Sequence, residues 1–408
     1  MELEERLGRS LRDGLDRIDV RTGDLAAVRA DGARLRRRRR RAVLAGVAAA
    51  GVVVSVSVVA LGGDAGRSPA PDPAPPVKGQ GAWERLPDAP VPARSMPLVG
   101  WTGEEVVFVG GDPEPCPANA DCDRVPTVAS DGAAYDVEAG TWRVIAEAPV
   151  GMGYYFRTTM VGDTMVVFGD GRWWAYDAGD DAWTRVPDPP VPTRDSGSIS
   201  SRGGEVYALS RQGRVQVLDL AAGTWSELPA MPTPLFDAVA VATSTGVAVS
   251  GRTSPRDVLL TSTVQLWDGS RWTEGSTDQT NPFRHWTGER LVELDLQGGE
   301  SPAGTTIPYG GRLDPATREW APLPDPPTSA GGDGWSLVAA DGPLLLGWGF
   351  VYDDRAETWT RVPPKPDAAV GDGASAVLVD GRVVVVGGVD PVGAGPEDQP
   401  AQAWSWTP

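Results

Sequence analysis

Short apolar runs recur along the chain from residue 82 onwards, and most are rich in valine or leucine. The seven runs are Val106–Val109, Met165–Phe168, Val206–Leu209, Val247–Ser250, Leu291–Leu294, Leu344–Leu346 and Val383–Val386. A second β-type run precedes each of them, as in Asp237–Ala242, Ser336–Ala340 and Ala374–Val379. Tight turn signals such as Val161-Gly162-Asp163 and Asp380-Gly381 join the paired runs. This pattern predicts a series of antiparallel hairpins.

An aspartate followed by a tryptophan marks the second half of each repeat. The spacing is six residues at Asp136/Trp142, Asp177/Trp183, Asp219/Trp225, Asp314/Trp320 and Asp353/Trp359, and it is four at Asp268/Trp272. A proline-containing stretch follows most of these tryptophans. Each unit is therefore expected to hold a partner strand, an apolar strand, an Asp-bearing strand and a Trp-bearing strand.

One such sheet leaves its faces uncovered, whereas seven placed radially bury them. The repeat therefore predicts an all-β fold, a seven-bladed β-propeller over residues 82–408. Trp83 begins an outer strand with no inner strands before it, and the last unit, ending Ala403–Trp406, has only three strands. The two ends are expected to share one sheet and so close the ring. Six blades remain the alternative if a middle unit is degenerate.

The repeat resembles the Kelch repeat, whose second strand often ends in Gly-Gly and whose Tyr-Asp pair precedes a tryptophan. The matching residues are Gly110-Gly111, Tyr135-Asp136, Tyr176-Asp177, Tyr352-Asp353 and Gly387-Gly388. The middle units depart from this pattern, with Ser210 and Ser250 in place of glycine and Leu218 and Leu313 in place of tyrosine. The resemblance implies the propeller fold shared by galactose oxidase and Kelch proteins, here in a membrane-anchored bacterial form, and no single subfamily.

The first 41 residues form a basic segment with 13 arginines, no lysine and 8 acidic residues. Arg36–Arg41 directly precedes Ala42–Leu61, which carries no charge. A helix of that length covers about 30 Å, the thickness of the hydrocarbon layer. We therefore expect a transmembrane helix over residues 42–63, with a cytoplasmic N-terminus and an extracellular C-terminal body. A signal peptide cleaved near Ala60 is the alternative.

Two further segments flank this span. Before it, residues 1–35 place Leu3, Leu7, Leu11, Leu15 and Ile18 on one face of a predicted helix. That helix rests on the membrane or on itself, or it contacts a cytoplasmic partner. After the span, residues 64–81 are rich in proline and predict a semi-rigid stalk.

Charge excludes one class of partner. The chain holds 37 basic and 55 acidic residues, a net charge of −18. Because residues 1–41 are net positive, the body is more acidic still. Phosphate groups would be repelled, so no nucleic-acid binding is expected there.

Few residues are available for catalysis. The chain has one histidine, His285, and two cysteines, Cys116 and Cys122. The copper site of galactose oxidase needs two histidines and a Tyr–Cys cross-link, so it cannot form, and a zinc site also lacks ligands. We interpret the repeated aspartates as turn residues and the repeated tryptophans as packing between blades. The expectation is no enzyme activity, no cofactor and no metal, with a carboxylate-based carbohydrate-active enzyme as the alternative.

One face of the propeller is the predicted binding face. In a four-stranded meander, the second-to-third loop and the connection into the next blade emerge on the same side. The long second-to-third loops are Asp112–Ser130, Arg252–Ser262, Gly298–Thr306 and Val389–Pro400, and Cys116 and Cys122 are expected to form a disulfide in the first. The candidate ligand-binding residues are Asp112, Glu114, Asp121, Asp123, Tyr154, Tyr155, Arg157, Arg194, Arg284, Trp335, Asp390, Glu397 and Asp398.

The acidic residues of this set have two interpretations. They either serve only to keep the protein soluble, or they form a site for a cationic partner or Ca²⁺. The leading hypothesis is an extracellular, non-catalytic module that binds a protein or a glycan. A transmembrane sensor or regulator acting through residues 1–35 is a further possibility.

Overall fold

The computed structural model describes residues 81–408 except 115–126, 154, 194–197, 255–261, 278–280, 295–298, 301–305, 308–309, 327–336, 367–372 and 390–399. The expected helix of residues 1–35, the span of residues 42–63 and the stalk up to residue 80 lie outside the described residues. Pro73–Pro408 forms one of two compact units of the chain. The part of the chain that the structure describes contains no helix, and so none with the length and apolar character needed to cross a bilayer.

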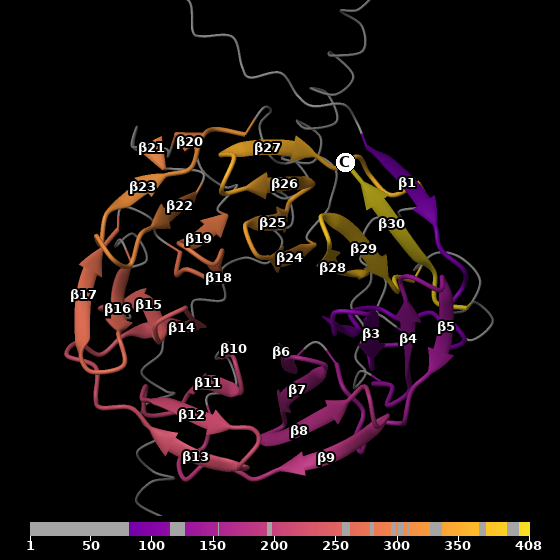
Figure 1. The fold of residues 1–408 in the computed structure, drawn as a ribbon, viewed down its shortest axis with the longest axis horizontal. Helices are drawn as coiled ribbons and strands as arrows, with labels where there is room; N and C mark the ends of the chain where they lie inside the picture. Colours follow the sequence, from indigo (N-terminus) through magenta and orange to yellow (C-terminus); the bar gives the residue numbers. More distant parts are fainter. Residues whose placement is uncertain are drawn as a thin grey trace, which may run out of the picture. The chain divides into compact units, whose positions relative to one another are not determined.

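The described part is an all-β propeller of seven four-stranded antiparallel sheets (Figure 1). The first blade holds β2 (Leu98–Trp101), β3 (Glu105–Val109), β4 (Gly132–Asp136) and β5 (Thr141–Val144). The second holds β6 (Arg157–Val161), β7 (Thr164–Gly169), β8 (Arg172–Asp177) and β9 (Ala182–Val186). The third holds β10 (Ile199–Arg202), β11 (Glu205–Leu209), β12 (Val215–Asp219) and β13 (Thr224–Glu227).

The next three blades repeat this order from inner to outer strand. The fourth holds β14 (Phe236–Ala242), β15 (Val247–Arg252), β16 (Thr263–Trp267) and β17 (Trp272–Ser276). The fifth holds β18 (His285–Trp286), β19 (Leu291–Leu294), β22 (Gly310–Leu313) and β23 (Trp320–Pro322), with the small hairpin of β20 (Gly299–Glu300) and β21 (Thr306–Ile307) between its second and third strands. The sixth holds β24 (Val338–Asp341), β25 (Leu344–Gly347), β26 (Phe350–Asp353) and β27 (Thr358–Arg361).

The seventh blade closes the ring and joins both ends of the propeller. It contains β28 (Ser375–Val379), β29 (Arg382–Val386), β30 (Ala403–Thr407) and, as the outer strand, β1 (Ala82–Arg85). β1 pairs antiparallel with β30, and Trp83 lies opposite Trp406. The predicted closure and the choice of seven blades are therefore confirmed.

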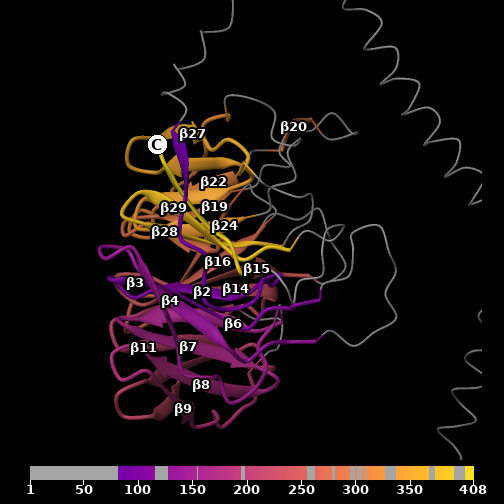
Figure 2. The same cartoon turned by 90° about the vertical axis from the view of Figure 1, so that its right-hand side faces the viewer.

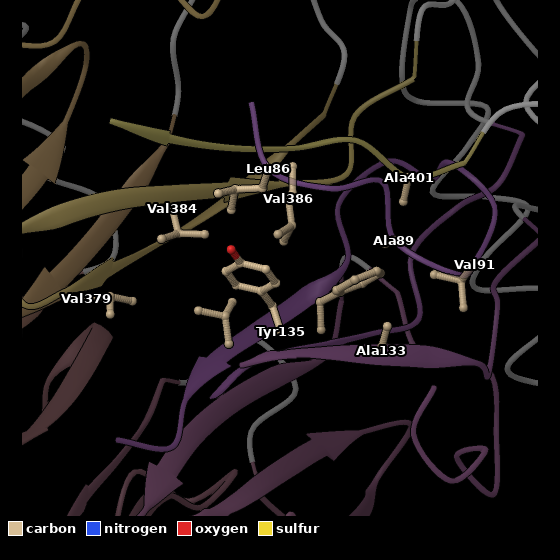
Figure 3. Packing of buried hydrophobic residues seen from close by; sticks show 12 residues of the cluster. Leu86, Ala89, Val91, Ala133, Tyr135, Val379, Val384, Val386 and Ala401 are labelled. Carbon is tan, nitrogen blue, oxygen red and sulfur yellow. The ribbon is translucent and has the colours of Figure 1, made fainter. Parts of the chain in front are cut away.

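The seam between the seventh and first blades shows how the ring is held shut (Figure 3). Its core combines Val384 and Val386 of blade 7 with Ala133 and Tyr135 of blade 1. Leu86, Ala89 and Val91, which follow β1, pack into the same cluster. Because all these side chains are buried, closure removes apolar surface from water in addition to forming the β1–β30 ladder.

The repeated tryptophans fasten neighbouring blades. In six of the seven repeats, the indole Nε1 donates a hydrogen bond of 2.7–2.9 Å to a backbone carbonyl in the connection that leaves the preceding blade. The pairs are Trp83 to Pro363, Trp142 to Pro87, Trp183 to Ala146, Trp225 to Pro187, Trp272 to Pro229 and Trp359 to Pro324. The prediction that these residues pack between blades is confirmed, and the hydrogen bond explains why tryptophan and not phenylalanine occupies the position.

The repeated aspartates are turn residues, as predicted. Asp136 Oδ1, for example, accepts the backbone N–H groups of Glu138 and Ala139 at 2.9 and 2.7 Å. Equivalent bonds are made by Asp177, Asp219, Asp268, Asp314 and Asp353. The carboxylate satisfies N–H groups that the tight turn leaves unpaired, which is a sufficient reason for the repeat.

Removing one indole donor tests the fastening role. We expect Trp183→Phe to lower the free energy of unfolding by about 1 kcal/mol, because the Ala146 carbonyl loses its partner while the ring still packs. Trp101→Phe is the matched control, since its indole makes no hydrogen bond within the described residues. Denaturant unfolding of both variants gives the comparison, and equal losses would contradict the assigned role.

Candidate functional site

The two faces of the propeller are built from different connections. Second-to-third loops and the connections into the next blade lie on one face, which we call the loop face. First-to-second and third-to-fourth turns lie on the other, which we call the turn face. Viewed edge-on, the blades lie side by side and β20, which belongs to a second-to-third connection, lies beside them on the loop face (Figure 2).

Exposed large apolar side chains are confined to the loop face within the described part of the chain. Tyr155 is 75% exposed and lies two residues before β6, and Val338 is 52% exposed and begins β24. The full set is Met96, Val128, Val144, Tyr155, Phe236, Val338 and Trp348. Each lies in a second-to-third loop, in or beside a connection between blades, or at the strand end that meets one. The turn face has no such residue among those described.

A cavity of about 670 Å³ lies on the inner side of four blades. It is lined by the innermost strands β2, β6, β24 and β28 and by residues directly before them. Its walls are largely apolar, with the polar side chains of Thr158, Thr159, Ser375 and Asp341 among them. Ser375 Oγ donates a hydrogen bond of 2.7 Å to the Pro97 carbonyl and so links the inner strands of blades 7 and 1. Cavities of this size and polarity are common ligand sites.

Two exposed apolar residues are held in a strained backbone conformation. Met96 has φ of 52° and Trp348 has φ of 54°, a left-handed region that bulky side chains rarely adopt. Met96 directly precedes the Pro97–Trp101 wall of the cavity, and Trp348 forms the second-to-third turn of blade 6. Such strain costs about 1–3 kcal/mol per residue and often accompanies binding sites.

An ion pair between the buried Arg94 and the partly exposed Asp131 fixes the loop face in blade 1. Arg94 is 1% exposed and holds Asp131 through two parallel bonds, Nη1 to Oδ1 at 2.6 Å and Nη2 to Oδ2 at 3.0 Å. The same guanidinium donates to the carbonyls of Pro92 and Gly110. The hydrogen bond from Arg94 lowers the pKa of Asp131 below its usual value. The connection entering blade 1 is thereby tied to the end of its long second-to-third loop.

Five of the predicted binding residues are described, and all five lie on the loop face. Asp112 accepts the backbone N–H of Glu114 at 2.8 Å and pairs with Ser95 in an isolated bridge. Arg157 donates to the Phe156 carbonyl at 3.1 Å, and Arg284 forms an ion pair with the buried Glu293. The other predicted residues lie outside the described residues: Asp121, Asp123, Tyr154, Arg194, Trp335, Asp390, Glu397 and Asp398, together with Cys116 and Cys122.

The single histidine begins the inner strand of blade 5. Burial, and then the charge of Arg284, lowers the pKa of His285 to about 4, so the imidazole is neutral at physiological pH. Among the described residues, no group of three His, Cys, Asp or Glu side chains is placed to hold a metal ion.

Sequence reasoning missed Met96, Trp348 and Arg94. A signal was present for Trp348, because Gly347-Trp348-Gly349 places a large aromatic residue in a two-residue turn between strands. Met96 had no such signal, since its exposure depends on how the connection crosses to β2.

Comparisons with known proteins do not assign this chain to a family. No protein-family model matches the sequence, and the search of curated proteins found no match. Among solved structures, that of YjhT aligns with 58% of this chain and 98% of its own, at 13% identity and a TM-score of 0.38. A TM-score this low does not establish a shared fold, so the propeller assignment is based on the strand pairing of this chain.

Proposed function

We propose that this chain is a membrane-anchored, Kelch-like propeller that binds a polypeptide partner on its loop face outside the cell and catalyses no reaction. The observation that carries the proposal is the one-sided distribution of exposed apolar side chains among the described residues. Solubility alone gives no reason for seven such residues to share one face.

The residue types favour a protein over a glycan or a nucleic acid. Tyrosine, tryptophan, methionine and arginine are enriched at the centres of protein interfaces. The loop face offers Tyr155, Trp348, Met96 and Arg157 in or next to connections between strands. The net negative charge of the chain opposes any polyanionic partner.

The cavity lined by β2, β6, β24 and β28 provides a pocket for the proposed binding surface. Met96 precedes the β2 wall of the cavity, Val338 lines it at the start of β24, and Tyr155 lies just before β6. An apolar side chain of the partner inserted into this space would be surrounded by these residues. An anchor in a pocket with an apolar rim is the common arrangement of a strong interface.

The location is inferred from the first part of the sequence. Arg36–Arg41 before the uncharged Ala42–Leu61 supports a cytoplasmic N-terminus and an external propeller. The proline-rich residues 64–81 would hold the propeller clear of the bilayer.

Glycine substitutions at the two strained positions test the proposal without harming the fold. Met96→Gly and Trp348→Gly remove exposed apolar side chains where glycine fits the backbone best. A random peptide library is panned against the full chain in nanodiscs, and the selected peptides are titrated against wild type and both variants. We expect the affinity to fall at least about tenfold in the double variant.

The matched control is Asp380→Gly, the same kind of change at a positive φ on the turn face. It is expected to leave peptide affinity unchanged. Equal affinity of the wild type and the double variant would overturn the binding face. Turnover of glycan or peptide substrates by the purified chain would instead support an enzyme.

A further inference from the structure

A second cavity, of about 480 Å³, lies on the turn face between blades 4 and 5. Four turns surround it, two from each blade: Thr243–Thr245 and Asp268–Arg271 of blade 4, and Gly288–Glu289 and Asp314–Arg318 of blade 5. It lies on the opposite face from the surface proposed for the polypeptide partner, so it is a separate site.

The space exists because this seam lacks a network that fills another seam of the ring. Between blades 1 and 2, Arg143 pairs with Glu105 at 2.6 Å, and Tyr176 donates to Asp181 at 2.6 Å. Strand register gives the equivalent positions between blades 4 and 5. Gly246 takes the position of Glu105, and Thr273 takes that of Arg143. Leu313 takes the position of Tyr176, and Arg318 takes that of Asp181. The smaller side chains, and a guanidinium in place of a carboxylate, leave this seam open.

Two half-buried tryptophans contribute to the lining. Trp267 ends β16, and Trp286 ends β18. Within the described residues, neither indole nitrogen donates a hydrogen bond to the protein, whereas Trp272 next to Trp267 fastens its blade through Pro229. The cavity lining therefore includes two aromatic side chains whose N–H groups have no protein acceptor among the described residues.

Arg318 lies at the rim with a strained backbone. Its φ is 64°, and blades 1 and 3 have glycine at the equivalent turn position, Gly140 and Gly223. Among the described residues its guanidinium forms no ion pair, and the same holds for the carboxylate of Glu289, which also lines the cavity. Arginine in place of glycine here costs about 1 kcal/mol of backbone strain, which no ion pair among the described residues offsets.

We propose that this cavity is a binding site for an uncharged saccharide. The two indoles would cover the apolar face of a sugar ring, and Arg318, Glu289 and the threonine hydroxyls would donate to and accept from its hydroxyl groups. The lining includes two arginines, Arg271 and Arg318, and three acidic residues, Asp268, Glu289 and Asp314. It therefore has no excess of positive charge that would select a phosphate or carboxylate ligand. The volume lies within the roughly 300–1,000 Å³ of small-molecule sites.

Calorimetric titration of the full chain tests this site. The probes are maltotriose, cellotriose, mannotriose and galactotriose, each added to about 10 mM, with trigalacturonate as the acidic counterpart. We expect at least one neutral trisaccharide to bind with a Kd of about 1 mM or lower. Arg318→Gly should weaken that binding at least about tenfold, while the melting temperature stays equal or rises, since glycine relieves the strain.

Asp380→Gly is the control, because Asp380 lies in a turn on the same face, with φ of 49°, and does not line the cavity. It should keep the wild-type saccharide affinity. Absence of heat with all four neutral probes, equal binding by Arg318→Gly, or binding of trigalacturonate alone would overturn the proposal. Peptide binding on the loop face should be unaffected by Arg318→Gly, so the two proposals fail independently.

Discussion

Replacing residues 82–86 with a Gly-Ser segment of the same length is expected to lower the free energy of unfolding of the propeller by on the order of 5 kcal/mol. The change removes the whole of β1, its four paired positions on β30 and the indole bond from Trp83 to Pro363. It also removes Leu86 from the core that seals blades 7 and 1. β30 would then become an exposed edge, with backbone groups that pair with other chains.

Chemical denaturation followed by tryptophan fluorescence measures this loss, and light scattering detects the self-association expected of the open edge. The control replaces residues 74–78, which precede β1 in the sequence. An unfolding midpoint that matches the control would show that the six continuous blades hold together without the shared sheet.

Most of the fold was predictable because it depends on contacts that repeat. The Asp–Trp spacing follows from a turn that needs a carboxylate and from an indole that bridges blades, so each repeat carries its own signal. The closure was predictable for a different reason. A lone outer strand at Trp83 and an incomplete sheet at Trp406 each lack a partner, and each is the only partner left for the other. The hairpin of β20 and β21 had no repeated counterpart and was missed.

The sites were less predictable because they depend on departures from the repeat. The exposed Met96 and Trp348 result from local backbone conformations that no spacing of residues records. The cavity between blades 4 and 5 results from side chains that do not form a network, and this can be recognised only after strand register aligns Arg318 with Asp181. The shortened Asp268/Trp272 spacing was visible in the sequence, but its location beside a cavity was not.

Arg290→Leu is expected to lower the free energy of unfolding by about 3–5 kcal/mol at pH 7, because it leaves a buried carboxylate without its counter-charge. Asp354 of blade 6 is 2% exposed, and its Oδ2 accepts hydrogen bonds of 3.0 Å from both Arg290 Nε and Thr287 Oγ1 of blade 5. Without the guanidinium, no opposite charge offsets the cost of removing this carboxylate from water.

The double variant Arg290→Leu/Asp354→Leu should recover most of the loss, because it also removes the carboxylate that the single variant leaves unpaired. Urea unfolding of both variants at pH 7 makes the comparison. Arg271→Leu is the control, since its pair with Asp268 is largely exposed and contributes about 0–1 kcal/mol. A double variant no more stable than the single variant would show that the Arg290 side chain stabilises the seam by packing and not by charge.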